Sequence, residues 1–400
     1  MPHALSRVSL LFGSVPELDV LYADEFTYVG EFAYDHACVP NAPAGYLPKP
    51  AWSPLLAQRV PYLGHFVAFR RQILDLPKSH DSVGTAGLDA LIRAASSSRG
   101  IGHLTEPLSA RPVDSPQVIR SVRREEAPVV TGRQPQRADR TISVVVPTKD
   151  HAADLERCLR SVRSGTQGLP VEVIVVDHES TEPATARVIA DFADKVIRQE
   201  GDFNFSRLVN AGVARADGQL VVLLNNDTEG LSEAWLDQLA SPFASSRVGA
   251  VGALLLEVDD CIQHTGIAVG GSGLTTHPYR GAPRELDDPP GLARDIREVT
   301  AATGACLAVR RDVYLDLGGM DEEYLVHYQD VDLCLRIWDA RLSVVVNPAC
   351  VLRHKESSSL HQADWTTISA HSRRDRTRFR ERWASLVAHD DLFLRGAGAG

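Results

Sequence analysis

Between residues 142 and 256, apolar runs alternate with segments of helical periodicity, and this alternation restricts the fold more than any other feature. The runs are short and almost entirely apolar, as strands buried on both faces are. They are Ile142–Val146, Val171–Val176, Leu220–Leu224 and Val248–Leu256. After the first run, Leu155, Leu159 and Val162 recur at helical spacing. Strands that alternate with helices form a mostly parallel sheet covered on both faces, so we predict an α/β fold.

Hydroxyl side chains mark the expected starts of helices in this region. Thr181 precedes Pro183 and is expected to cap a helix, because a threonine oxygen accepts hydrogen bonds from a first turn and proline suits its first position. Ser206 and Ser232 are expected to begin two more helices. Later in the chain a helix and two separate strands are predicted: Asp330–Ala340, Leu342–Val346 and Cys350–Leu352.

The composition is that of a globular protein and excludes several classes. The 400 residues carry a formal net charge of -10, which argues against a general nucleic-acid-binding protein. No apolar run reaches the roughly 18 residues that span a bilayer, and the N-terminal patch Val8–Phe12 lacks a secretory cleavage site. None of the 6 cysteines forms a Cys-x-x-Cys pair, so we expect reduced, buried thiols. A soluble cytoplasmic protein is therefore expected.

Residues 111–140 are rich in proline, arginine, glutamine and glutamate, which is typical of a linker. They separate a short region, 1–110, from the predicted catalytic region, 141–360. A helical basic tail is expected to follow at 361–400. The sequence therefore predicts two folded regions joined by a linker.

The tail has two open interpretations. Residues 373–386 are rich in arginine, and basic amphipathic helices can contact anionic lipid headgroups. This would place the protein peripherally at the inner face of a membrane. Alternatively, Phe379 and Trp383, which share a helical face with Leu386, pack a solvated helix against the main domain.

Two acidic residues follow apolar runs at the positions where open sheets bind ligands, the carboxyl ends of the strands. Asp177 is placed to accept hydrogen bonds from a nucleotide base or ribose. Asp227 is placed to hold Mg²⁺ or Mn²⁺, which prefer oxygen ligands. A single aspartate at such a position more often caps a loop or helix. Two of them after successive strands favour a ligand site.

A further acidic pair, Asp330 and Asp332, stands at the start of a predicted helix. Its simplest role is to stabilise the helix dipole, and this suffices for Asp332. Asp330 follows the aromatic-rich approach that ends in Tyr328, so its carboxylate could serve as a general base. His354 follows a short predicted strand and is a candidate second metal ligand.

A series of motifs extends this interpretation from Thr141 to Ser359. They are VVVPTKD (144–150), VIVVDHES (173–180), NFSRLVNAG (204–212), VLLNNDTE (222–229), TGACLAVRRDVYLDLGGMDEEY (303–324), QDVDLCLR (329–336) and RHKESSS (353–359). In order and spacing they resemble the inverting family-2 glycosyltransferases of GT-A fold, most closely the bacterial rhamnosyltransferase-type branch. The resemblance implies a GT-A domain, Rossmann-like with a mostly parallel sheet, accompanied by a small α+β N-terminal region.

The resemblance also implies roles for matching residues. The general base would be Asp330, and the metal ligands, for Mg²⁺ or Mn²⁺, would be Asp227 and His354. Nucleotide-binding residues would be Pro147, Asp177, Asn210 and Asn226, with Asn225–Asp227 at the family's DxD signature. The acceptor or sugar pocket would include Gly304, Tyr328 and Gln329. Gln329 departs from the family pattern, which often has glutamate there.

The implied activity is transfer of a sugar from a dTDP- or UDP-linked donor to a glycan or lipid-linked glycan acceptor, in surface polysaccharide synthesis. Direct displacement would invert the anomeric centre. One alternative is a non-catalytic sugar-binding or assembly module, which the retained Asp177, Asp227, Asp330 and His354 disfavour. Another is a sugar nucleotidyltransferase, but Pro147-Thr148-Lys149-Asp150 lacks the glycine-rich loop such enzymes usually carry.

Residues 1–110 contain partial echoes of the main region. The frame Gly-x-x-x-Ala-x-Arg-Arg occurs at Gly64 and again at Gly304. Three further matches support it: Leu21–Glu25, Lys49–Pro54 and Gly84–Arg93. Gly87 takes the place of the base, and Ala110 lies near the expected position of a ligand histidine. We infer a truncated, inactive glycosyltransferase remnant, although short Arg-Arg strings also recur by chance.

Overall fold

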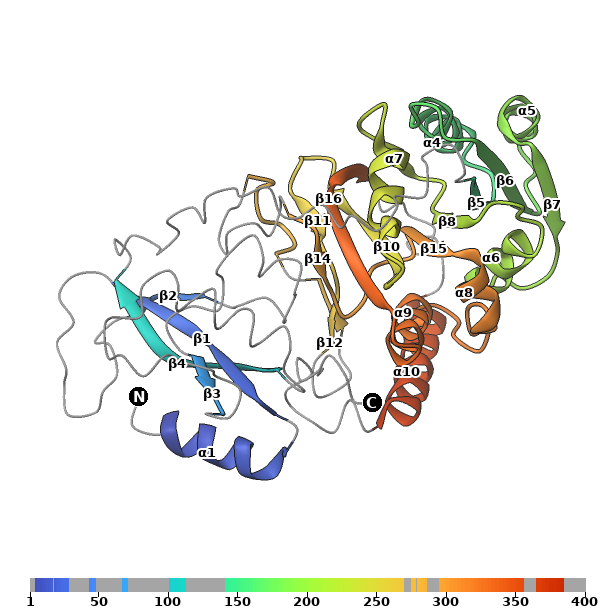
Figure 1. The fold of residues 1–400 in the computed structure, drawn as a ribbon. Coiled ribbons are helices and arrows are strands. Elements are labelled where there is room, and N and C mark those ends of the chain that lie inside the picture. Colours follow the sequence, from blue (N-terminus) through green and yellow to red (C-terminus); the bar gives the residue numbers. More distant parts are fainter. Residues whose placement is uncertain are drawn as a thin grey trace. The chain divides into compact units, whose positions relative to one another are not determined.

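The computed structural model of the chain describes the following residues: 4–16, 18–28, 43–47, 67–70, 101–112, 141–269, 275–277, 279–285, 295–355 and 365–384. Contacts divide the chain into two units. The described residues of the first unit lie between 4 and 112, and those of the second lie between 141 and 384. Figure 1 shows both units, which are described separately below.

The larger unit is built on a mixed 10-stranded sheet. Its strands are β5 (Ile142–Thr148), β6 (Val171–His178), β7 (Lys195–Gln199), β8 (Leu220–Leu224), β9 (Thr228–Gly230), β10 (Val248–Leu256), β11 (Ile262–His264), β14 (Arg297–Glu298), β15 (Cys306–Arg310) and β16 (Ser343–His354). The main order is β14-β16-β10-β15-β8-β5-β6-β7, with β11 beside β10 and β9 beside β16. A separate pair is formed by β12 (Ala268–Val269) and β13 (Thr275–Thr276).

The strands from β8 to β7 are parallel, as the alternation in the sequence predicts. Every residue of β5, β8 and β10 is buried, which explains why their sequences are nearly continuous apolar runs. The helices lie on both faces of the sheet (Figure 1). They are α4 (Ala152–Ser164), α5 (Pro183–Phe192), α6 (Phe205–Val213), α7 (Trp235–Ala240), α8 (Arg311–Asp316), α9 (Gln329–Asp339) and α10 (Trp365–Arg382). The predicted α/β fold is confirmed.

Two features of the second half of the sheet differ from the prediction. β15 is an antiparallel strand inserted between β10 and β8, where no strand was predicted. β16 is one continuous strand, so the prediction of two separate strands was wrong. Its register against β10 shifts between Ala253 and Leu254, which pair with Asn347 and Val351. The residues of β16 between these two, Pro348 among them, form a bulge that does not end the strand.

Three helix starts also differ. α7 begins at Trp235 with Ala234 at its N-cap, and not at Ser232. α5 has Glu182 at its N-cap, and no side-chain cap bond is formed there, so Thr181 is not the cap. Instead, Asp150 Oδ1 accepts the backbone N–H groups of Thr181 and Glu182, at 2.7 and 2.8 Å. These bonds lower the pKa of the Asp150 carboxyl. α6 is capped by Asn204, whose Oδ1 accepts the Arg207 N–H, and not by Ser206. Ser206 already lies inside α6, and Thr181 lies one residue before the N-cap of α5.

The helix α10 packs against the larger unit through its aromatic side. Phe379 and Trp383 are buried, and Trp383 Nε1 donates to Asp332 Oδ1 at 3.0 Å. Three arginines of the helix form ion pairs with acids of the same unit: Arg374, Arg378 and Arg382. These contacts favour the packed-helix interpretation. Contact of residues 373–386 with a membrane stays a prediction, and 385–386 lie outside the described residues.

Most of the described cysteines are free and buried, as the sequence predicts. Cys158, Cys306, Cys334 and Cys350 are free and buried, while Cys261 is partly exposed. Burial raises the pKa of the Cys158 thiol to about 12, so it stays protonated. None of the described helices is both long and apolar enough to cross a membrane.

The smaller unit has α+β character. It contains the helix α1 (Ala4–Ser14) and four strands: β1 (Val20–Tyr28), β2 (Pro43–Leu47), β3 (Val67–Phe69) and β4 (Ile101–Pro112). The central strand β1 is antiparallel to β2 and β3 and parallel to β4. The predicted linker begins inside β4, at residues 111–112, and its remaining residues, 113–140, lie outside the described part. The matches at 49–54 and 84–93 also lie outside it.

This arrangement repeats, element by element, a part of the larger unit. There β10 is likewise antiparallel to β11 and β15 and parallel to β16. In each unit the parallel pair changes register after an alanine, Ala23 in β1 and Ala253 in β10. The residues of the shared frame pair alike, because Ala68 lies opposite Leu21 and Ala308 lies opposite Val251. The two units therefore share a helix-and-four-strand arrangement.

The first arginine of the shared frame explains why the frame recurs. Arg310 donates to the carbonyls of Val248, Phe243 and Ser245 and lies 5.4 Å from the Phe243 ring centroid. Arg70 makes the same set of contacts in its own unit, to the carbonyls of Leu18, Phe12 and Val15, with its guanidinium 5.1 Å from the Phe12 ring. A guanidinium has enough donors to satisfy several carbonyls where a helix ends and a strand begins. The frame thus has a structural function in both units.

Replacing Arg310 with methionine is expected to destabilise the larger unit by about 2 kcal/mol or more, because three carbonyls lose a charged donor. The free energy of unfolding, measured by urea denaturation, tests this. The control is Arg311→Met, since Arg311 is the second arginine of the frame and makes none of these three bonds. Equal stability of the two variants would contradict the capping role.

Candidate functional site

Asp177 lies at the end of β6, beside the end of β5. Its side chain is 2% exposed, and its Oδ1 accepts the backbone N–H of Ser180 at 3.1 Å. Its Oδ2 accepts from Arg198 at 2.8 Å. Thr148, at the end of β5, is the register partner of Asp177, and Pro147 pairs with Val176 one step earlier. The predicted nucleotide-binding residues Pro147 and Asp177 therefore occupy adjacent strand ends.

The turn Asn225–Asp227 follows β8 and joins this edge. Asn226 Nδ2 donates to Thr148 Oγ1 at 2.9 Å, which ties the turn to the end of β5. Asn225 N–H donates to the carbonyl of Ala305 at 3.0 Å, next to the start of β15. Strand ends from β6 to β15 are thus linked in one row.

Asp227 and His354, the two predicted metal ligands, are in direct contact. His354 is the last residue of β16, and its Nε2 lies 3.2 Å from Asp227 Oδ1. Both side chains are nearly buried, 12% and 11% exposed. Asn225 Nδ2 lies 3.4 Å from the same ring nitrogen. β9 pairs with β16 so that Thr228 is the register partner of His354, and this register brings the two residues together.

The pair fits a divalent cation in donor type and spacing. A carboxylate oxygen and an imidazole nitrogen both suit Mn²⁺, and the oxygen suits Mg²⁺. Two ligands in adjacent octahedral positions, each at about 2.1 Å from the ion, are roughly 3 Å apart. The described residues contain no cluster of three or more histidine, cysteine or acidic side chains that could hold a metal. A cation here would take its remaining ligands from water or substrate, as Mg²⁺ commonly does.

Asp330 opens α9 and is held against the start of β15. Its Oδ2 accepts the N–H of Gly304 at 2.9 Å, and its Oδ1 accepts the N–H of Val331 at 2.8 Å. A Cβ at Gly304 would lie 3.5 Å from Asp330 Cβ, so the two residues are in close contact. Because Ala305 also binds Asn225, Asp330 belongs to the same end of the sheet as the Asn225–Asp227 turn. Each carboxylate oxygen keeps capacity for another hydrogen bond.

The two residues before Asp330 lie differently. Gln329 Nε2 donates to the Val326 carbonyl at 3.3 Å, while its Oε1 is buried and has no partner in the part of the chain described. Tyr328 is buried, and its backbone adopts the left-handed conformation (φ 71). Its ring stacks on that of Phe379, with the ring centroids 4.7 Å apart. Gln329 thus has a spare acceptor, whereas the Tyr328 ring packs against α10.

Asn210, a predicted nucleotide-binding residue, has its amide engaged within the protein. Its Oδ1 accepts from Tyr314 Oη at 2.6 Å and from the Met320 N–H at 3.0 Å. Its Nδ2 donates to the Met320 carbonyl and to Glu322, both at 2.9 Å. The residue therefore connects α6 to the segment after α8, and a nucleotide contact stays a prediction.

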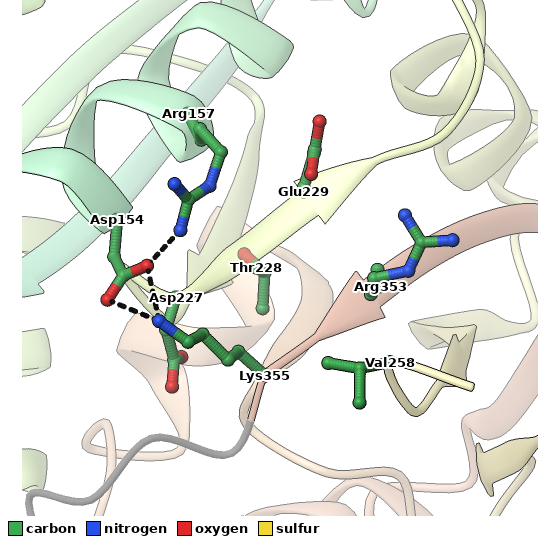
Figure 2. Close-up of a pocket in the computed structure, with 8 residues that line it drawn as sticks. All are labelled: Asp154, Arg157, Asp227, Thr228, Glu229, Val258, Arg353 and Lys355. Carbon is green, nitrogen blue, oxygen red and sulfur yellow. Dashed lines mark hydrogen bonds and ion pairs between the residues drawn. The ribbon is translucent and has the colours of Figure 1, made fainter. Parts of the chain in front are cut away.

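A hollow of about 150 Å³ opens beside Asp227 (Figure 2). Sequence reasoning missed the residues that line it with Asp227: Asp154, Arg157, Thr228, Glu229, Val258, Arg353 and Lys355. Asp154 accepts from both Arg157 and Lys355, and Lys355 Nζ lies 3.2 Å from Asp154 Oδ1. The Lys355 backbone N–H donates to the Asp227 carbonyl at 3.1 Å. Cationic side chains thus stand next to the Asp227–His354 pair.

The strand β11 supplies two more residues that the sequence did not indicate. Gln263 contacts His354, and His264 Nε2 accepts the N–H groups of Gly266 and Thr303, at 3.3 and 3.4 Å. Burial lowers the pKa of His264 well below its ordinary value, so the ring is neutral. The only available signal was a Gln-His pair within a short apolar segment.

The larger unit is thus an α/β domain whose polar side chains gather where β5, β6, β8 and β16 end, the place where such sheets bind ligands. Residues 143–317 match the family described as "Glycosyl transferase family 2". This segment of the larger unit is thus similar to the family-2 glycosyltransferases, and the match together with the observed α/β sheet confirms the predicted GT-A fold class.

Relatives extend the similarity beyond this segment. The O-antigen biosynthesis protein RfbC of Myxococcus xanthus is 33% identical over 411 residues, covering 92% of this chain and 31% of that protein. The chain therefore spans less than a third of that relative's length. The N-acetylglucosaminyl-diphospho-decaprenol L-rhamnosyltransferase of Mycobacterium tuberculosis (strain CDC 1551 / Oshkosh) is 28% identical over 54% of this chain and 77% of its own. These relatives confirm the predicted resemblance to the rhamnosyltransferase-type branch.

Among solved structures, GalNAc-T7 with UDP, GalNAc and Mn²⁺ is similar, with a TM-score of 0.46 and 16% identity. The match covers 62% of this chain and 50% of that one.

Proposed function

We propose that residues 141–360 form a metal-dependent hexosyltransferase. It would move a sugar from a dTDP- or UDP-linked donor to a glycan or lipid-linked glycan acceptor, with inversion, in surface polysaccharide synthesis. The observation that carries the proposal is the Asp227–His354 pair, 3.2 Å apart and beside a hollow whose lining includes both cationic and acidic side chains. Such a site suits the charge of a diphosphate leaving group.

The residues of the site would divide the work as follows. Asp177, at its strand end, would bind the nucleotide, and Asn226 would hold the turn against Thr148. Asp227 and His354 would hold Mg²⁺ or Mn²⁺, which supplies positive charge to the departing diphosphate. Lys355 lies in the adjoining hollow and would add a second positive charge.

Asp330 would take the proton from the acceptor hydroxyl. The N–H groups of Gly304 and Val331 fix the carboxylate in place and leave it able to accept a further hydrogen bond. The unpartnered Oε1 of Gln329 supports an acceptor-side role for that residue, because a sugar hydroxyl could donate to it.

For residues 1–110 we propose a partial glycosyltransferase-like region without a catalytic site. The shared strand arrangement and the matching contacts of Arg70 and Arg310 support it. The strand pairing supports a comparison of positions: Phe26 pairs with Ala110 and Thr27 with Arg111, while Leu256 pairs with Arg353, the residue before His354. Neither Ala110 nor Arg111 can act as a histidine ligand, which supports a region without this metal site.

A panel of nucleotide sugars, each with Mn²⁺ or Mg²⁺, tests the proposal. A true donor at 100 times its dissociation constant should raise the free energy of unfolding by about 2.7 kcal/mol. It should then yield nucleoside diphosphate when an acceptor is added. Stabilisation by a sugar without product would favour the non-catalytic module. Release of pyrophosphate from a nucleoside triphosphate and a sugar phosphate would favour a nucleotidyltransferase.

A further inference from the structure

Gln263 is a buried residue whose amide is fully engaged around His354. Its side chain, in β11, is 4% exposed. Its Nε2 lies 3.1 Å from Glu257 Oε2 and 3.2 Å from the His354 carbonyl oxygen. Its Oε1 lies 2.7 Å from His354 Nδ1. One amide thus contacts both the backbone and the ring of the same histidine.

These neighbours fix which way the amide points. The carboxylate of Glu257 and the carbonyl of His354 can only accept, so the amide nitrogen must face them. The amide oxygen therefore faces the ring, and His354 Nδ1 must carry a hydrogen to donate to it. In a neutral imidazole only one nitrogen carries hydrogen, so with that hydrogen held on Nδ1 it is Nε2 whose lone pair is available to a metal.

That lone pair points to the place where a cation would bind. His354 Nε2 lies 3.2 Å from Asp227 Oδ1, a separation that suits a hydrogen on Nε2 when no metal is bound and two ligands of one cation when a metal takes the place of that hydrogen. We propose that Gln263 is a positioning residue, which sets the tautomer and ring orientation of His354 so that Nε2 can bind the divalent cation. The proposal rests on the proposed function, because it concerns the same cation.

Gln263→Met tests the role, because methionine has nearly the same length and makes no such hydrogen bonds. The affinity for Mn²⁺ alone, from the electron paramagnetic resonance signal of the free ion, should fall by about 10- to 100-fold. The matched control is Gln238→Met, since the Gln238 side chain is exposed, and its affinity should equal that of the unchanged protein. Gln263→Glu alone would set a second oxygen against Glu257 and the His354 carbonyl, so the conservative exchange is the double variant Gln263→Glu with Glu257→Gln. It keeps an oxygen facing Nδ1 and a donor between the two side chains, and it should retain more affinity than Gln263→Met.

The tautomer gives a second readout that needs no metal. Ring nitrogen-15 spectra of the metal-free protein should show His354 with hydrogen on Nδ1, assigned by its loss in His354→Ala. In Gln263→Met this signature should be lost or mixed. An unchanged tautomer together with unchanged Mn²⁺ affinity would overturn the proposal.

The variant Asp227→Asn separates this proposal from the proposed function. If Asp227→Asn binds Mn²⁺ as well as the unchanged protein, the metal site itself is wrong. If Asp227→Asn loses binding while Gln263→Met keeps both affinity and tautomer, only the role of Gln263 fails. Should Gln263→Met not fold, as judged by circular dichroism, the double variant Gln263→Glu with Glu257→Gln carries the comparison, and loss of the Nδ1 hydrogen in it would overturn the proposal.

Discussion

Replacing Asp227 with asparagine is expected to lower the rate of sugar transfer by about 10³-fold, equivalent to roughly 4 kcal/mol of activation free energy. The carboxylate would contribute the charge that holds the cation, and an amide cannot. Because the Asp227 backbone carbonyl, and not its side chain, accepts from Lys355, the turn should keep its shape in the variant. Single-turnover transfer with the donor identified by the panel measures the effect.

Asp24→Ala is the matched control for this prediction. Asp24 lies in β1 of the smaller unit, the region proposed to have no catalytic site. Its replacement should leave transfer unchanged. If Asp24→Ala abolished transfer while Asp227→Asn did not, the assignment of the catalytic unit would be reversed.

Replacing Asp330 with asparagine is expected to reduce kcat by about 10²- to 10⁴-fold, the usual contribution of a general base. The asparagine oxygen can still accept the Gly304 N–H, so the loop before β15 should stay in place. Donor binding, measured by thermal stabilisation, should therefore remain while transfer is lost.

The control for Asp330 is Asp339→Asn, at the exposed end of the same helix. It should retain kcat. A kcat for Asp330→Asn close to that of Asp339→Asn would show that another group takes the proton. A loss of donor binding would instead assign Asp330 to the nucleotide side of the site.

Local patterns in the sequence predict much of the fold because buried strands and amphipathic helices have their own periodicities. β8 and β10 begin and end where the apolar runs do. The antiparallel strand β15 was missed because its five residues are too few to show the periodicity that distinguishes a strand from a helix. The predicted helix caps at Thr181 and Ser206 were wrong, because Asp150 from another loop binds the backbone before α5 and because α6 begins one residue before Ser206, with Asn204 as its cap.

The candidate site divides in the same way. Strand-end position indicates Asp177 and Asp227, since a carboxylate after a buried strand has few packing roles. For Asp330 and His354 the residues allowed a candidate role, which the resemblance then made specific. The residues that hold them, Gln263 and Gly304, act through hydrogen bonds between distant segments, which no local pattern encodes.

The alternation of strands and helices along the chain, the family resemblance and the identity of the acidic residues could therefore be inferred from the sequence, because each is carried by short runs of consecutive residues. Only the tertiary structure decided that Asp227 and His354 lie 3.2 Å apart and that Gln263 orients the histidine. The physical reason is register: the pairing of β9 with β16 and of β11 with β10 brings these side chains together, and pairing between distant strands is set by the packed sheet as a whole.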